Sequence, residues 1–156
     1  MVKLMRVDSR LLHGQVAVTW VNHVAAGSIL IADDEVMSNE MAKLALKMAK
    51  PADCKLAIRS IDGGAELLRD PRTKDMSIFV IVRTIKDAIR LAEQTDCIRH
   101  VNIGGVKKKE NSKMVSNGVY LNNEDLADLK KLGELVEEVE FRLVPSDPKH
   151  SAKNLI

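Results

Sequence analysis

Apolar residues recur along this chain at two spacings, one typical of buried strands and one typical of amphipathic helices. Short apolar runs predict strands at residues 3–7, 28–32, 55–59, 77–82, 100–103, 119–121 and 139–143. Between them, apolar residues at helical spacing predict helices at 15–25, 39–49, 62–68, 85–93 and 124–131. This alternation predicts an α/β fold: a mainly parallel, doubly wound sheet of about six or seven strands, with helices on both faces and the last strand antiparallel.

Polar residues mark the expected starts of these helices. The expected N-caps are Ser38 for helix 39–49, Asn122 or Asn123 for helix 124–131, and Thr84 for helix 85–93. In helix 39–49 the residues on one face are Met41, Leu44, Ala45 and Met48. Because methionine fills irregular gaps in protein interiors, we expect Met37, Met41 and Met48 to lie in the core, with a partner groove as the less favoured alternative.

Length and charge narrow the function classes. The 156 residues fit a single domain, 1–156. A net charge of +2 and an aromatic content of 3% argue against a nucleic-acid partner. The N-terminus has the pattern of a strand, and no apolar run reaches about 18 residues, so we expect a cytoplasmic protein. Cys54 and Cys97 lack the spacing of a zinc site, so we expect both thiols to be reduced and to serve in packing. We expect the protein to bind no metal and no cofactor.

The segment RVDSRLLHGQV, residues 6–16, holds the main candidate chemistry, because it places His13 just before a predicted helix. Helix N-termini bind anions, and a neutral imidazole can attack phosphorus near pH 7. Gly14 permits close approach to the backbone, and Arg10 or Arg6 would supply positive charge. From these residues alone, His13 is either a nucleophile or a solvated loop or capping residue. Asp8 either orients the ring or an arginine, or is a simple turn residue.

Other polar groups should gather near this candidate nucleophile, because the carboxyl ends of parallel strands meet at one edge of a sheet. For Asp33 and Asp34, turn or capping roles are favoured over a metal site, since no third ligand is evident. Thr84 is most simply the N-cap of helix 85–93, and the alternative is that its hydroxyl helps to shape the pocket around His13. Gly104 and Gly105 lack the spacing of a phosphate-binding motif and are interpreted as loop architecture.

The segment RVDSRLLHGQV also closely resembles the active-site segment of a known family: the IIB components of the mannose and sorbose family of the bacterial phosphoenolpyruvate-dependent sugar phosphotransferase system. The matching positions are Arg6, Asp8, Arg10, Leu11, His13, Gly14 and Gln15. Further similarity lies in IADDEV at 31–36, RT at 83–84, NIGG at 102–105 and VPSD at 144–147. The resemblance therefore covers essentially the whole chain.

The resemblance implies a phosphocarrier transferase, a protein-Nπ-phosphohistidine:sugar phosphotransferase. His13 would accept a phosphoryl group on Nδ1 from a phosphohistidine of the IIA component. It would pass the group to a sugar held by the membrane components IIC and IID, which would also keep the protein at the inner face of the membrane. Asp8 and Arg10 fall on active-site positions of the family, with Arg10 assisting the transfer. The residues expected around the phosphate or the pocket are Arg6, Gly14, Gln15 and Thr84.

Two alternatives stay open beside this hypothesis. One is a module of the same fold that binds a phosphorylated ligand without covalent chemistry, and the other is a regulatory relative that contacts a transcriptional partner. The lysines at 107–109, within the segment 107–113, form either a solvated loop or a docking site for an acidic surface. The sugar and the oligomeric state are left open by the sequence, and a homo-oligomer is one of the states that it allows.

Overall fold

The computed structural model describes residues 1–155 and, of Gln15, the backbone alone. One sheet contains seven strands in the order β3-β2-β4-β1-β5-β8-β9. Six of them are parallel: β3 (Lys55–Arg59), β2 (Ser28–Ala32), β4 (Ile78–Val82), β1 (Val2–Asp8), β5 (His100–Gly105) and β8 (Glu138–Phe141). The last strand, β9 (His150–Ser151), is antiparallel to β8. The predicted fold class is confirmed.

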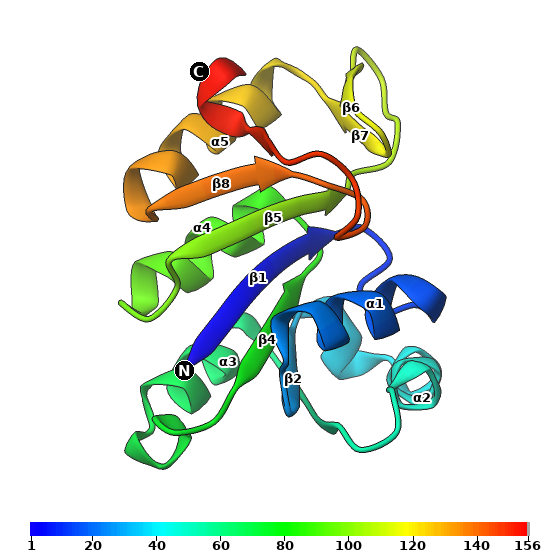
Figure 1. Cartoon of the computed structure of the whole chain (residues 1–156), viewed down its shortest axis with the longest axis vertical. Helices are drawn as coiled ribbons and strands as arrows, with labels where there is room; N and C mark the ends of the chain where they lie inside the picture. The colour runs from blue at the N-terminus through cyan, green and yellow to red at the C-terminus, as the bar shows by residue number, and fades with distance from the viewer. Residues whose placement is uncertain (156) are drawn as a thin grey trace.

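Five α-helices cover the two faces of this sheet (Figure 1). One face carries α1 (Gly14–Val24) and α2 (Glu40–Ala49), and the other carries α3 (Ile61–Arg69), α4 (Ile85–Gln94) and α5 (Asn123–Leu135). Two apolar cores result. One packs Trp20 and Leu46 against the sheet, and the other packs Leu91 and Leu129 against it. The helical periods in the sequence predicted all five helices, because each buries an apolar stripe on the sheet.

A small hairpin and three short 3₁₀ helices complete the described chain. The hairpin pairs β6 (Lys113–Ser116) with β7 (Val119–Leu121) across the turn residues Asn117 and Gly118, and it is separate from the main sheet. The sequence predicted 119–121 as a strand but not its partner. The 3₁₀ helices are η1 (Glu35–Ser38), η2 (Pro71–Thr73) and η3 (Ala152–Leu155). Through β9 and the buried Ala152, the C-terminal segment packs onto the domain.

Side-chain caps start several helices. Thr84 caps α4, and its Oγ1 accepts a backbone hydrogen bond of 3.0 Å. Asn122 caps α5 in a reciprocal capping box with Asp125. The prediction that Ser38 caps α2 is wrong, because Ser38 belongs to the preceding η1. Asn39 caps that helix instead, and its Oδ1 accepts a backbone hydrogen bond of 3.0 Å.

The prediction that three methionines fill the core is wrong. Met37 is 37% exposed, and Met41 and Met48 are each 79% exposed. Leu44, on the same face of α2, is 55% exposed. The helix packs instead through a face centred on Leu46, with the partly buried Ala42 and Ala49 beside it. The sequence pattern contained two apolar faces on this helix, and the narrower one is buried.

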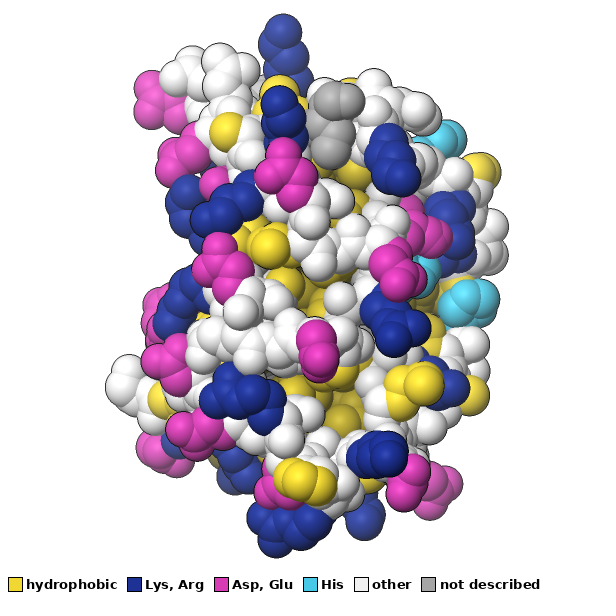
Figure 2. Space-filling model, turned by 90° about the vertical axis from the view of Figure 1, so that its left-hand side faces the viewer, with side chains coloured by type: hydrophobic (Ala, Val, Ile, Leu, Met, Phe, Trp, Pro, Cys, Tyr) yellow, Lys and Arg dark blue, Asp and Glu magenta, His cyan; other side chains and the backbone are white. Residues whose placement is uncertain are grey.

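The surface of the domain mixes charges of both signs. Figure 2 shows the side on which several strands begin, where Lys and Arg side chains are interspersed with Asp and Glu and apolar atoms lie between them. Across residues 1–155, no helix is long and apolar enough to cross a membrane.

Candidate active site

The loop between β1 and α1, residues 9–13, is fixed at the carboxyl edge of the sheet. The backbone N–H of Ser9 donates to the carbonyl of Gly105 at 2.8 Å, and that of Leu11 donates to the carbonyl of Asp8 at 2.9 Å. Leu11 has a φ of 58°, a left-handed conformation that is costly for a leucine, and its side chain is buried. The buried anchor and the strained backbone together set the position of His13 at the start of α1.

His13 and Asp8 form the central contact of this loop. The Nε2 atom of His13 lies 2.9 Å from Oδ2 of Asp8, and the two side chains are 21% and 2% exposed. A carboxylate only accepts hydrogen bonds, so this contact assigns the proton of the neutral ring to Nε2. Nδ1 then keeps its lone pair, and no partner of that atom is among the described contacts.

The first turn of α1 and Arg10 bring positive charge to the same loop. His13 is the N-cap of α1, and its side chain makes no capping hydrogen bond. No acidic residue occupies the first turn, so the partial positive charge of the helix end is not neutralised there. Gly14 begins the helix with a φ of 43°, a left-handed value that glycine adopts readily.

The backbone of Arg10 bonds to Asp8, whereas its side chain is exposed to solvent. Its N–H donates to Oδ1 of Asp8 at 2.9 Å. The residue is exposed, and no described group bonds or ion-pairs with its guanidinium. That guanidinium is therefore available to an anion that arrives beside His13.

Arg6 lies behind Asp8 as a buried support. Its Nε and Nη2 atoms donate to Oδ2 of Asp8 at 3.2 and 3.1 Å, and its Nη1 donates to Oδ1 of Asn102 at 2.7 Å. Burial lowers the pKa of the Arg6 guanidinium, and the ion pair with Asp8 opposes that shift. The sequence grouped Arg6 with residues around the phosphate, and the structure directs its guanidinium to Asp8.

Gly104 and Gly105 make room for this ion pair. A Cβ on Gly104 would lie 1.9 Å from Nη1 of Arg6, and one on Gly105 would lie 2.9 Å from Oδ1 of Asp8. Both glycines belong to β5, against which the two side chains pack. Their interpretation as loop architecture was therefore wrong, because both lie within a strand and provide the space in which the Arg6–Asp8 pair is buried.

A buried polar network continues from Arg6 towards β8. The Nδ2 atom of Asn102 donates to Oε2 of Glu140 at 3.3 Å and to the Arg142 carbonyl at 3.1 Å. Glu140 accepts from Arg142 at 3.0 and 2.8 Å and lies 3.0 Å from Nε2 of His100. Burial raises the pKa of Glu140, but the hydrogen bonds of His100 and Arg142 outweigh it and hold that pKa at about 2.

Trp20 ties α1 to the same network. The guanidinium carbons of Arg6 and Arg142 lie 5.4 and 5.1 Å from the centre of its ring. Its Nε1 donates to the Leu143 carbonyl at 3.0 Å. These contacts are within the range of cation–π attraction, so the helix that carries His13 at its start is packed directly on the support of Asp8.

Asp33 and Asp34 have the structural roles that were favoured for them. Asp33 accepts from a backbone N–H of η1 and from Arg83 at 3.2 and 3.0 Å, and Arg83 also donates to the Ser9 carbonyl at 3.4 Å. The pair with Asp33 raises the pKa of Arg83. Asp34 accepts from the first N–H of α3 and from Arg90. In the part of the chain that the structure describes, no cluster could hold a metal ion.

Thr84 lies near the loop without a hydrogen bond to His13 among the described contacts. It lines a cavity of about 380 Å³ together with Ser9, Arg83 and residues 107–109, while its Oγ1 serves the cap of α4. Of those lysines, Lys109 forms an ion pair with Asp125. The side chain of Gln15, another predicted site residue, lies outside the described residues.

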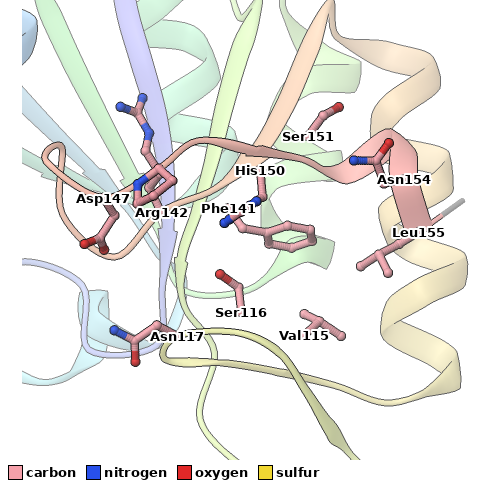
Figure 3. Close-up of a pocket in the computed structure, with 11 residues that line it drawn as sticks. Val115, Ser116, Asn117, Phe141, Arg142, Asp147, His150, Ser151, Asn154 and Leu155 are labelled. Carbon is pink, nitrogen blue, oxygen red and sulfur yellow. The ribbon is translucent and has the colours of Figure 1, made fainter.

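A second cavity, of about 430 Å³, lies between the hairpin and the C-terminal segment (Figure 3). Arg142, Asp147 and His150 are among its lining residues. Arg142 donates a hydrogen bond to Glu140, and Asp147 accepts one from the backbone N–H of Val144. The predicted site residues are absent from this lining, so the cavity is separate from the candidate active site.

Comparison with known proteins identifies the family. A family model described as the PTS system sorbose subfamily IIB component matches residues 2–156. A probable phosphotransferase enzyme IIB component of Streptococcus pyogenes serotype M6 is 38% identical, over 100% of this chain and 99% of that protein. The sorbose-specific EIIB component of Klebsiella pneumoniae is 29% identical, over 94% of this chain and 90% of that protein.

Solved structures agree with the sequence matches. The IIBSor domain of the sorbose permease from Klebsiella pneumoniae superposes with a TM-score of 0.93 at 27% identity, covering 99% of this chain and 95% of that one. The N-acetylgalactosamine-specific IIB component 1 of Escherichia coli gives a TM-score of 0.87 at 28% identity, covering 97% and 99%. The chain therefore belongs to the sorbose subfamily of phosphotransferase-system IIB components, which are phosphocarrier proteins of sugar uptake.

Proposed function

We propose that this chain is a protein-phosphohistidine:sugar phosphotransferase in which Nδ1 of His13 carries the phosphoryl group. The donor is a phosphohistidine of a IIA component, and the acceptor is a sugar held by IIC and IID components at the inner face of the membrane. The observation that carries the proposal is the 2.9 Å contact between Nε2 of His13 and Oδ2 of Asp8. It occupies one ring nitrogen and leaves the other as nucleophile.

Asp8 has an electrostatic role in this mechanism. In the first transfer, the lone pair of Nδ1 forms a bond to phosphorus while the donor's N–P bond breaks, and the donor imidazole keeps that electron pair. Positive charge develops on the His13 ring, and the carboxylate that accepts its Nε2–H stabilises that charge. The two hydrogen bonds from Arg6 keep the carboxylate of Asp8 in place.

Arg10 and the start of α1 act on the phosphoryl group. Phosphoryl transfer depends mainly on position and on neutralisation of the phosphoryl oxygens, which an exposed guanidinium and helix amides supply. A relay must also release its cargo, so the phosphorylated state should be bound only moderately. The exposed position of Arg10 suits that requirement, because solvent weakens its attraction.

One relative supports a IIA donor. The mannose-specific EIIAB component of Escherichia coli K12 is 28% identical to this chain, which covers 48% of that longer protein. Its name joins IIA and IIB in one polypeptide, an arrangement in which donor and acceptor histidines belong to the same molecule. For the present chain, we expect the surface of the IIA donor to dock over the loop 9–13.

The proposal is tested by enzymatic phosphorylation and intact mass. The purified chain is incubated with phosphoenolpyruvate, the two general phosphotransferase proteins and a mannose-family IIA component. We expect the mass of one added phosphoryl group, which acid removes. His13→Ala should abolish the addition, and His23→Ala, a change at the exposed histidine of α1, should preserve it.

Each other outcome is informative. An unmodified wild-type chain with several active IIA components would favour the noncovalent binding module. A phosphoryl group that persists in His13→Ala would assign the reaction to a different histidine.

A further inference from the structure

β3 is the outer strand of the sheet on the side away from β9, and among the described strands it pairs with β2 alone. The N–H of Lys55 donates to the Gly27 carbonyl, and the carbonyl of Arg59 accepts from Asp33. In a parallel ladder, alternate residues direct their backbone groups to opposite sides. The backbone groups of Leu56 and Ile58 therefore point to the open edge, where the Ile58 carbonyl accepts a hydrogen bond of 2.9 Å from Nη1 of Arg59.

A groove of about 530 Å³ follows this edge on the α2 side. Its apolar floor comprises Met37, Cys54, Leu56 and Ile58. Its remaining lining residues are all cationic: Lys43, Lys47, Lys50, Lys55 and Arg59. None of these lining residues is acidic. Among the described ion pairs, their cationic groups have one carboxylate partner, the exposed Glu40, which lies 3.4 Å from Lys43.

A second groove, of about 600 Å³, follows the same strand on the α3 side. Ala57, Leu67 and Met76 are among its apolar lining residues, and Glu66, Asp70 and Arg72 are among its charged ones. On both faces the apolar side chains of β3 are only half covered, in contrast to the fully buried β4 in the middle of the sheet. An open backbone edge with a hollow on each face has the shape that one added strand would fill.

We propose that this edge, the β3 edge, binds an extended, acidic segment of a partner protein as an additional strand. The added strand accepts and donates backbone hydrogen bonds at Leu56 and Ile58, and at the Ile58 carbonyl it takes the place of the Arg59 guanidinium. Its acidic side chains face Lys43, Lys47 and Lys50, and its apolar side chains face the α3 side. A second copy of the chain is a poor occupant, because antiparallel pairing of two β3 edges brings Lys55 of each copy close to Arg59 of the other.

The β3 edge is distinct from the site around His13. β2 and β4 lie between β3 and β1, which separates β3 from β1 by roughly 14 Å at the usual strand spacing. The proposal therefore does not depend on the phosphoryl chemistry, and variants at this edge leave His13 and Asp8 in place.

The test uses the full chain labelled with ¹⁵N and a synthetic acetylated peptide of alternating glutamate and valine. We expect the largest amide shifts in β3, with slower hydrogen exchange at Leu56 and Ile58. Lys47→Glu/Lys55→Glu should weaken binding by about tenfold or more. The matched control, Lys130→Glu/Lys153→Glu, makes the same charge change at exposed lysines elsewhere and should bind like the wild type.

Three results would overturn the proposal. Equal binding of a peptide with N-methylated backbone amides would show charge attraction without strand addition. Shifts confined to residues outside β3 would place the peptide elsewhere. If the peptide gives no response, binding of anionic phosphatidylglycerol vesicles would assign the edge to a lipid surface. Concentration-dependent dimerisation without a response to the peptide would assign the edge to a second copy of the chain.

Discussion

The Nε2 atom of His13 and the Oδ2 atom of Asp8 lie 2.9 Å apart, and the same Oδ2 accepts two hydrogen bonds from Arg6. One carboxylate oxygen thus connects the partly buried ring of His13 to the buried guanidinium of Arg6. This arrangement explains how a ring on a loop keeps a fixed orientation, because its partner is held from behind by charge-assisted hydrogen bonds.

Asp8→Asn should slow phosphorylation of the chain by at least about 100-fold. The amide permits the other tautomer of His13 and stabilises the charged ring less, which is costly where a histidine must present one particular nitrogen. Rapid-quench measurement of phosphorylation by IIA gives the rate. Because the substitution also removes the charge partner of buried Arg6, a urea unfolding curve must accompany it. A folded variant within a few-fold of the wild-type rate would contradict the role of Asp8.

Arg10→Ala should reduce the phosphorylation rate by about tenfold to 100-fold with little change in stability. The side chain is exposed and without a described partner, so its removal should alter the free energy of unfolding by less than about 0.5 kcal/mol. Arg99→Ala, which removes another exposed arginine, is the matched control and should transfer normally. Equal rates for the two variants would mean that Arg10 does not act on the phosphoryl group.

Gly104→Ala should destabilise the fold by about 3 kcal/mol or more. The new Cβ would lie 1.9 Å from Nη1 of Arg6, so it must displace a buried guanidinium from its carboxylate. Gly27→Ala is the control, since its Cβ would meet no atom within 4 Å. Urea unfolding of both variants measures the difference. A Gly104→Ala protein as stable as Gly27→Ala would contradict the packing of Arg6 described above.

Glu140 should make the stability of the domain depend on pH below its ordinary pKa of 4.5. Its pKa of about 2 in the folded chain is lower than in the unfolded chain, so the folded state binds fewer protons. The stabilisation, up to about 3 kcal/mol, is present above pH 4.5 and is lost as the pH falls towards 2. Glu140→Gln should be less stable at pH 7, and its deficit should shrink over this interval. Urea unfolding at several pH values tests this, and a constant deficit would contradict it.

The regular elements could be predicted from the sequence because their signal is local. Strands 28–32 and 55–59 match the observed β2 and β3, since an apolar run between polar turns has one simple interpretation. β6 and β9 were missed because they are short and polar and depend on partners rather than on their own pattern. The exposed Met41 shows the same limit, because the period of a helix does not tell which of two apolar faces meets the sheet.

The candidate site divides in a similar way. Asp8, at the end of β1, and Arg10 and His13, in the loop that follows, lie within six consecutive residues, so their proximity follows from their short separation in the sequence. The support by Asn102 and Glu140 was not predicted, because it depends on which strands are neighbours and in what register. The paired glycines after Asn102 were the one local signal, since consecutive residues without side chains inside a strand indicate a close approach.

The most direct test of the central claim is to determine which ring nitrogen carries the phosphoryl group. The chain, labelled with ¹⁵N in histidine, is phosphorylated by a IIA component, and long-range ¹H–¹⁵N correlations of the histidine rings are recorded. The account predicts one phosphorylated ring, His13, with phosphorus on Nδ1 and a proton on Nε2 that is hydrogen-bonded to Asp8. A phosphoryl group on Nε2 of His13, or on any other histidine, would contradict it.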